Sequence, residues 1–92
     1  MEHTDLRESV TARVIEVISA NQHSAPGVVK EESTFLELGI DSLDGLHILF
    51  ALEEEFNLDI PDDAAREFSS VRQVVDGVIT LLERKSAAAI PA

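Results

Sequence analysis

Residues 39–56, GIDSLDGLHILFALEEEF, decide the fold because they specify one long helix. Asp41 is a residue type that favours the N-cap, and Asp44 places an acid in the first turn, where it interacts favourably with the helix dipole. At about 100° per residue, one apolar face recurs along the segment. It comprises Ile48, Leu49, Leu52 and Phe56. The spacing therefore predicts a helix over 42–56 with one face in a core.

A second apolar face lies on the same predicted helix, roughly 150° from the first. It comprises Leu43, Leu46 and Phe50, and His47 and Glu54 lie on the same side. A helix in a small bundle needs one apolar stripe, so a second one edged with carboxylates indicates a partner-binding surface or the wall of a cleft. The alternative is that neighbouring segments cover these side chains.

The segment before this helix predicts another helix and a long connection. Apolar residues recur at helical spacing over 4–20, and Thr4 is the expected N-cap. The next twenty or so residues lack a sustained period, and a connection that long is typically functional or locally ordered. Within it, STFLELG (33–39) predicts a turn that is capped by Ser33 or Thr34 and closed by Gly39. The Phe and the second Leu of this turn are expected to point inward.

The segment after the helix completes the predicted bundle. Pro61 ends the helical pattern, and DDAAREF (62–68) predicts a short helical piece. The last helix begins at Ser70, which has capping-box spacing to Gln73. The fold class is therefore all-α, a small four-helix bundle of three main helices and one short helix, with a long first loop. We expect one domain over residues 1–85 and a flexible C-terminal tail over 86–92.

Charge and composition restrict the function. The formal net charge is −11, and the stretch from Glu31 to Glu67 holds twelve acids and a single base, Arg66. Such a segment repels nucleic acid and either favours basic protein partners or forms a plain solvated face. The chain contains no cysteine, no signal-peptide pattern and no apolar run of membrane length. We therefore expect a cytoplasmic protein without membrane insertion.

The serine at the start of the predicted helix, Ser42, has three interpretations: a helix cap, a nucleophile or an attachment site. A nucleophile needs a general base and an oxyanion hole. The segment lacks the G-x-S-x-G pattern, and His47 lies about 140° around the helix from Ser42, out of hydrogen-bond reach. The sequence also lacks a phosphate-binding P-loop, a calcium-binding loop and a pair of histidines at metal-ligand spacing. We therefore predict neither a catalytic nor a metal site, and a protein that is not an enzyme.

The segment LGIDSLDGLHILFALEEEFNLDIPDD, followed by SSVRQVVDGV, resembles the freestanding acyl carrier proteins. The likeness consists of an L-G-x-D-S-L box, a helix ending in A-L-E-E-E-F and a D-I-P-D turn, and it extends roughly from Leu6 to Leu82. It implies that Ser42 carries 4′-phosphopantetheine, transferred from coenzyme A by a phosphopantetheinyl transferase. The implied function is to hold acyl intermediates as thioesters for fatty-acid, polyketide or specialised lipid biosynthesis.

The resemblance and the second apolar face together predict the contacts with partner enzymes. The partner-binding residues expected are Asp41, Leu43, Asp44, Leu46, His47, Phe50 and Glu54. The partners expected are the transferase and the basic docking surfaces of acyl ligases, synthases or transferases, with the carrier acting as a monomer. An apolar cleft under the middle helix is expected to shelter the acyl chain.

Three positions depart from the usual pattern of the family. His47 replaces an acid, Gly45 replaces a small hydroxyl residue, and Phe50 stands where a flexible residue is frequent. We hypothesise that Phe50, with Phe68 nearby, makes the acyl pocket smaller or differently shaped. Two other functions stay open. One is a peptidyl or aminoacyl carrier for an adenylating enzyme, and the other is a helical adaptor that uses its acidic face only for binding.

Overall fold

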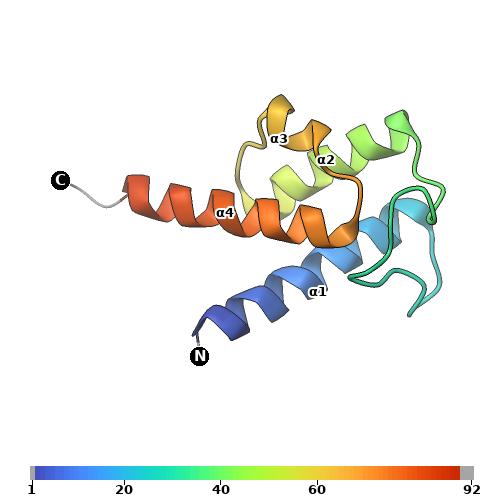
Figure 1. Cartoon of the computed structure of the whole chain (residues 1–92), viewed down its shortest axis with the longest axis horizontal. Coiled ribbons are helices and arrows are strands. Elements are labelled where there is room, and N and C mark those ends of the chain that lie inside the picture. The colour runs from blue at the N-terminus through green and yellow to red at the C-terminus, as the bar shows by residue number, and fades with distance from the viewer. Residues whose placement is uncertain (1, 90–92) are drawn as a thin grey trace.

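The computed structural model describes the backbone over residues 2–89 and the surroundings of the side chains over residues 6–85. This part of the chain contains four helices (Figure 1). They are α1 (Glu2–Gln22), α2 (Ser42–Phe56), α3 (Asp62–Arg66) and α4 (Val71–Ala89). The described residues contain no strand, only an isolated antiparallel bridge between Thr34 and Ser70. The predicted all-α bundle of three main helices and one short helix is confirmed.

Three predicted boundaries differ from the structure. The short helical piece predicted over 62–68 ends at Arg66. α1 begins at Glu2, so Thr4 lies inside the helix instead of capping it. α4 runs to Ala89, so residues 86–89, expected as the start of a flexible tail, are helical. Residues 90–92 lie outside the described part of the chain.

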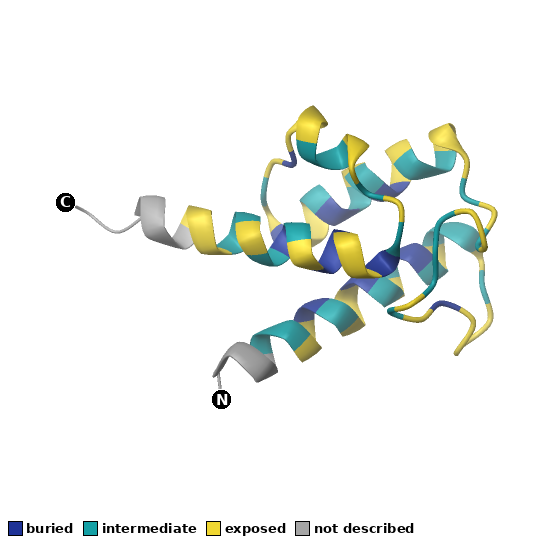
Figure 2. Ribbon diagram, viewed as in Figure 1, coloured by how far each residue is buried: buried dark blue, intermediate teal, exposed yellow. Residues whose placement is uncertain are grey.

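The core is formed where α1 packs against both α2 and α4 (Figures 1 and 2). The predicted inner face of α2 is correct, since Ile48, Leu52 and Phe56 are buried and Leu49 is half-buried against them. Among the residues whose burial is described, no polar side chain is buried. The remaining core residues come from α1, α4 and two loops, and they are Val10, Val14, Ile18, Val29, Ile60, Val71, Val74, Val75 and Val78.

The long connection between α1 and α2 is ordered around the turn predicted at 33–39. Thr34 Oγ1 accepts a hydrogen bond from the Glu37 amide at 3.1 Å, and the Glu37 carboxylate accepts one from the Thr34 amide at 3.0 Å. Thr34 is therefore the cap of this turn. Phe35 and Leu38 are half-buried against the core, as expected. Gly39 ends the turn with φ of +70°, a left-handed conformation that favours glycine.

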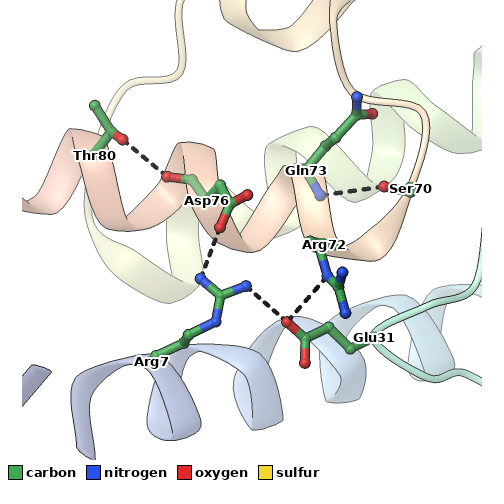
Figure 3. A network of polar contacts seen from close by, with 7 residues as sticks. All are labelled: Arg7, Glu31, Ser70, Arg72, Gln73, Asp76 and Thr80. Atoms are coloured by element: carbon green, nitrogen blue, oxygen red, sulfur yellow. Dashed lines mark hydrogen bonds and ion pairs between the residues drawn. The ribbon is translucent and has the colours of Figure 1, made fainter. Parts of the chain in front are cut away.

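A network of ion pairs ties this connection to α1 and α4 (Figure 3). Arg7 Nη1 lies 2.7 Å from Asp76 Oδ1, and Arg7 Nη2 lies 2.7 Å from Glu31 Oε2. Arg72 Nε approaches the same Glu31 oxygen at 3.6 Å. The hydrogen bond to Asp76, and then the one to Glu31, raise the pKa of Arg7. We call these four residues the Glu31 network.

The segments around α3 position the start of α4. Pro61 is the N-cap of α3 in an extended conformation, with φ of −62° and ψ of 149°. The helix before it, which Pro61 was predicted to end, already ends at Phe56, with Asn57 as its C-cap. Ser70 Oγ accepts a hydrogen bond from the Gln73 amide at 3.2 Å, as the capping-box spacing predicted. The Gln73 side chain, however, accepts from the Ser69 amide at 2.6 Å, so the return bond is made one residue earlier than expected.

Candidate functional site

Ser42 is the first residue of α2, and its side chain is exposed. Asp41 is the N-cap, with extended backbone angles of −93° and −173°. Its Oδ1 accepts a hydrogen bond from the Asp44 amide at 2.8 Å, and Asp44 Oδ2 accepts one from the Asp41 amide at 3.5 Å. This pair is a capping box, so Asp41, and not Ser42, caps the helix.

The position of Ser42 suits the attachment of a phosphate. The first backbone N–H groups of a helix lack intrahelical partners, and they stabilise a nearby anion together with the helix dipole. An exposed hydroxyl at this end is also open to approach by a large enzyme. The neighbouring carboxylates of Asp41 and Asp44 oppose a second negative charge, but their capping bonds direct them to backbone amides. The residues present therefore fit a phosphodiester on Ser42 Oγ.

The nucleophile interpretation finds no support in the side chains that the structure describes. His47 is exposed on the outward side of α2, and His23 lies after the end of α1. Within the described residues, no cluster of three His, Cys, Asp or Glu side chains is arranged to hold a metal ion.

An apolar cleft of about 470 Å³ begins at Ser42 and runs beneath α2 toward α3 and α4. Ile48, Leu49 and Leu52 supply its α2 wall, and Val74 lines it from α4. Asp62 and Arg66 of α3 are exposed residues of the lining. The other lining residues are Phe35, Ile40, Asp41, Gly45, Leu46, Ala65 and Phe68. The cleft expected under the middle helix is therefore present, and Ser42 is one of its lining residues.

The second apolar face of α2 is exposed, although Leu46 at its edge also lines the cleft. Leu43, Leu46 and Phe50 are 61%, 45% and 55% exposed, and His47 and Glu54 are exposed as well. The neighbouring segments therefore leave this face open. Phe50 is not among the residues that line the cleft, so the cleft gives no support to the hypothesis that this residue narrows an acyl pocket. Phe68, the second aromatic residue of that hypothesis, does line it.

The three consecutive glutamates at the end of α2 have different surroundings. Glu53 Oε2 accepts a hydrogen bond from the Ile60 amide at 2.8 Å, which fastens the loop after the helix. Glu55 Oε2 lies 2.8 Å from Arg13 Nε of α1. Glu54, the glutamate predicted to contact partners, is exposed. About 100° of rotation per residue turns three adjacent carboxylates in three directions.

Several exposed or cleft-lining residues were not identified from the sequence. Leu36 is 90% exposed and Val28 is 51% exposed, both in the connection between α1 and α2. The inward positions of the 33–39 turn were assigned to Phe35 and Leu38, and that assignment leaves Leu36 outside. Arg66 was identified only as the single base of the acidic segment, and its place in the cleft lining depends on how α3 packs.

The comparisons with known proteins agree with this geometry. The protein family described as "Phosphopantetheine attachment site" matches residues 8–78. The mitochondrial acyl carrier protein of Saccharomyces cerevisiae is 39% identical, over 76% of this chain and 60% of that protein. The mitochondrial acyl carrier protein of Dictyostelium discoideum is 41% identical, over 74% of this chain and 57% of that protein. The chain thus spans about 60% or less of the length of these curated relatives.

A solved structure is also similar along most of its length. The crystal structure of an acyl carrier protein from Thermotoga maritima matches with a TM-score of 0.75 and 34% sequence identity. The match covers 87% of this chain and 94% of that one.

Proposed function

The chain belongs to the acyl carrier proteins, a family that bears 4′-phosphopantetheine, and from this premise we propose that Ser42 is the residue that carries the group. The observation that supports this most is the position of an exposed serine at the capped start of α2 and at the mouth of an apolar cleft. The group supplies a terminal thiol that can hold an acyl chain as a thioester.

The residues of this chain have distinct tasks in that function. Ser42 Oγ forms the phosphodiester, and the first amides of α2 face its charge. The cleft beneath α2 takes an apolar acyl chain out of water, which stabilises it by about 0.8 kcal/mol per buried methylene. The carrier itself performs no catalysis, and the bond-making steps belong to the enzymes that visit it.

The exposed side of α2 is the proposed docking face. It consists of Asp41, Leu43, Asp44, Leu46, His47, Phe50 and Glu54, all exposed except Asp44, which is half-buried. Its carboxylates complement basic surfaces on a phosphopantetheinyl transferase and on acyl ligases, synthases or transferases, and complementary charge speeds encounter. The apolar residues between them supply contact area that binding removes from water.

The proposed setting is fatty-acid, polyketide or specialised lipid biosynthesis, with a monomeric carrier domain over residues 1–85. The described helices include none with the length and apolar character to span a membrane. The cytoplasm remains the compartment predicted from the sequence, while the two curated relatives are named as mitochondrial proteins.

The first test is the intact mass of the protein after incubation with coenzyme A and a promiscuous phosphopantetheinyl transferase. We expect the native chain to gain one phosphopantetheine unit and Ser42→Ala to gain none. Ser33→Ala is the matched control, because it removes a serine hydroxyl outside the site and should gain the unit normally. Loading of Ser42→Ala, or no loading of the native chain by a transferase that modifies another carrier, would contradict the assignment.

The peptidyl-carrier alternative is tested on the loaded protein. An aminoacyl group brings an ammonium charge, which is costly to bury against Ile48, Leu49 and Leu52. We therefore expect an apolar acyl chain, but not an aminoacyl group, to raise the melting temperature of the loaded protein.

The adaptor alternative instead predicts that Ser42→Ala retains full function in a cell that depends on the protein.

A further inference from the structure

Gly77 of α4 is held against an aromatic ring. A Cβ atom added at this position would lie 2.7 Å from both Cε1 and Cζ of Phe68, a distance that real Cβ contacts do not reach. By contrast, a Cβ added at Gly45, the other helical glycine, would meet no atom within 4 Å. The absence of a side chain at Gly77 is therefore what lets the Phe68 ring lie directly on α4.

Phe68 lies between this helix and the cleft. It belongs to the short segment that joins α3 to α4, where its amide donates a hydrogen bond to the Ala65 carbonyl at 3.2 Å. The ring packs against the core and also lines the cleft that begins at Ser42. The ring thus contacts α4 at Gly77 and also lines the cleft.

We propose that Phe68, seated on Gly77, sets the depth of the cleft and therefore the longest acyl chain that this carrier can bury. The inference rests on the proposed function, since it assigns a length limit to the chain tethered through Ser42. The occupant is an apolar acyl chain because Ile48, Leu49, Leu52 and Val74 form the walls beyond the serine. Carbons that extend past Phe68 remain in water.

The proposal predicts that protection of the acyl chain increases with its length up to one chain length and then stops increasing. We call this length the break. Each further methylene that enters the cleft favours the buried chain by about fourfold, which is 0.8 kcal/mol converted at room temperature. Methylenes beyond the limit add nothing. Protection of the thioester from hydroxylamine, relative to the same acyl group on free pantetheine, should therefore rise with chain length and then level off at one length.

Two single variants should move this break in opposite directions. Phe68→Ala removes the ring and should shift the break to a longer chain. Gly77→Ala forces the ring off α4 and should shift it to a shorter chain. The double variant Gly77→Ala with Phe68→Leu should recover part of the lost length, since leucine lacks the two ring atoms that the new Cβ meets. Thr80→Ala, an exposed change on α4, serves as the control and should leave the break in place.

Two further readouts separate a length limit from a loss of structure. A ¹³C-labelled terminal methyl group on a chain that reaches Phe68 should show a ring-current shift, which Phe68→Ala abolishes. In the protein without any cargo, chemical denaturation of the four members of the Gly77→Ala and Phe68→Leu cycle should give a non-additive free energy of unfolding. Additive values would mean that the two residues do not depend on each other.

The experiment distinguishes the two levels of the argument. If intact mass shows no loading at Ser42, the proposed function fails, and the inference fails with it. If loading is normal but the break occurs at the same chain length in all three proteins (the native chain, Phe68→Ala and Gly77→Ala), the inference alone is overturned. Opposite shifts in the two variants, with the control unchanged, would establish it.

Discussion

Replacing Glu31 with glutamine removes the carboxylate that joins the α1–α2 connection to α1 and α4. Its Oε2 atom lies 2.7 Å from Arg7 Nη2 and 3.6 Å from Arg72 Nε (Figure 3). The same connection carries Phe35, which lines the cleft, and leads directly into Ser42. Removing this carboxylate therefore tests whether ion pairs stabilise the connection that precedes the proposed attachment site.

The expected effect is modest because the participants are partly exposed. The side chains of Arg7, Arg72 and Glu31 are 40%, 57% and 27% exposed. Double-mutant cycles on exposed ion pairs give about 0.2–1 kcal/mol each. Two pairs are lost while Arg7 retains Asp76, so we expect the free energy of unfolding to fall by about 1 kcal/mol. A domain of this size then melts about 4–8 °C lower.

The assay is urea denaturation at low and at high salt. Raising the ionic strength from about 0.01 M to about 1 M shortens the Debye length from roughly 30 Å to roughly 3 Å, which should reduce the effect of the substitution by half or more. Glu32→Gln is the matched control, since it removes an exposed neighbouring carboxylate outside the network and lowers the self-repulsion of a chain with net charge −11 equally. Equal losses in the two variants, or a loss that salt does not change, would refute the reasoning.

Four further outcomes can be measured on the same protein. Asp41→Ala should lower the free energy of unfolding by about 1 kcal/mol through loss of the capping box, whereas Asp41→Asn should retain most of it because the amide oxygen still accepts the Asp44 amide. Leu52→Ala should cost about 2–5 kcal/mol by chemical denaturation, since Leu52 is 1% exposed in the centre of the core. Replacing both Leu43 and Phe50 with serine should slow modification by the transferase and leave the melting temperature nearly unchanged, because both side chains are more than half exposed. The pKa of Arg7 is raised in the folded protein, so its stabilising contribution is complete below the ordinary guanidinium pKa and is lost only as pH rises through the higher folded value. Arg7→Gln should therefore cost the same free energy of unfolding at about pH 7 and about pH 10.

The parts of the fold predicted correctly are those with a local physical cause. The bounds of α2 follow from Asp41, a side chain that caps, and from an Asn57 that ends the helix in the left-handed conformation with φ of 53°. The start of α1 was predicted two residues late, because Thr4 is a good cap by type yet the helix continues past it to Glu2. Capping residues indicate where a helix can begin, and they do not prevent an earlier start.

The role of Phe50 shows where periodicity and resemblance disagree. Helical spacing placed Phe50 on the outward face with Leu43 and Leu46, and its 55% exposure confirms this. The likeness to other carriers suggested instead that it narrows the acyl pocket, but Phe50 is not among the residues that line the cleft beneath α2. The residue that does meet the cleft, Phe68, is placed by the packing of α3 and of Gly77, which involves contacts that no local pattern in the sequence encodes.

The net charge alone also conceals how the acidic segment is used. Glu53 accepts a hydrogen bond from the Ile60 amide and Glu55 pairs with Arg13, so two of three adjacent carboxylates make contacts within the fold, whereas Glu54 is exposed and is the one proposed to contact a partner. Toward the other end of α2, Asp44 lies ten residues earlier, about 15 Å along the axis at 1.5 Å per residue. Leu46 and Phe50 occupy the interval and are exposed. A partner that fits this face therefore needs two separated basic groups with an apolar surface between them, whereas a uniformly basic patch would leave Leu46 and Phe50 without apolar contacts.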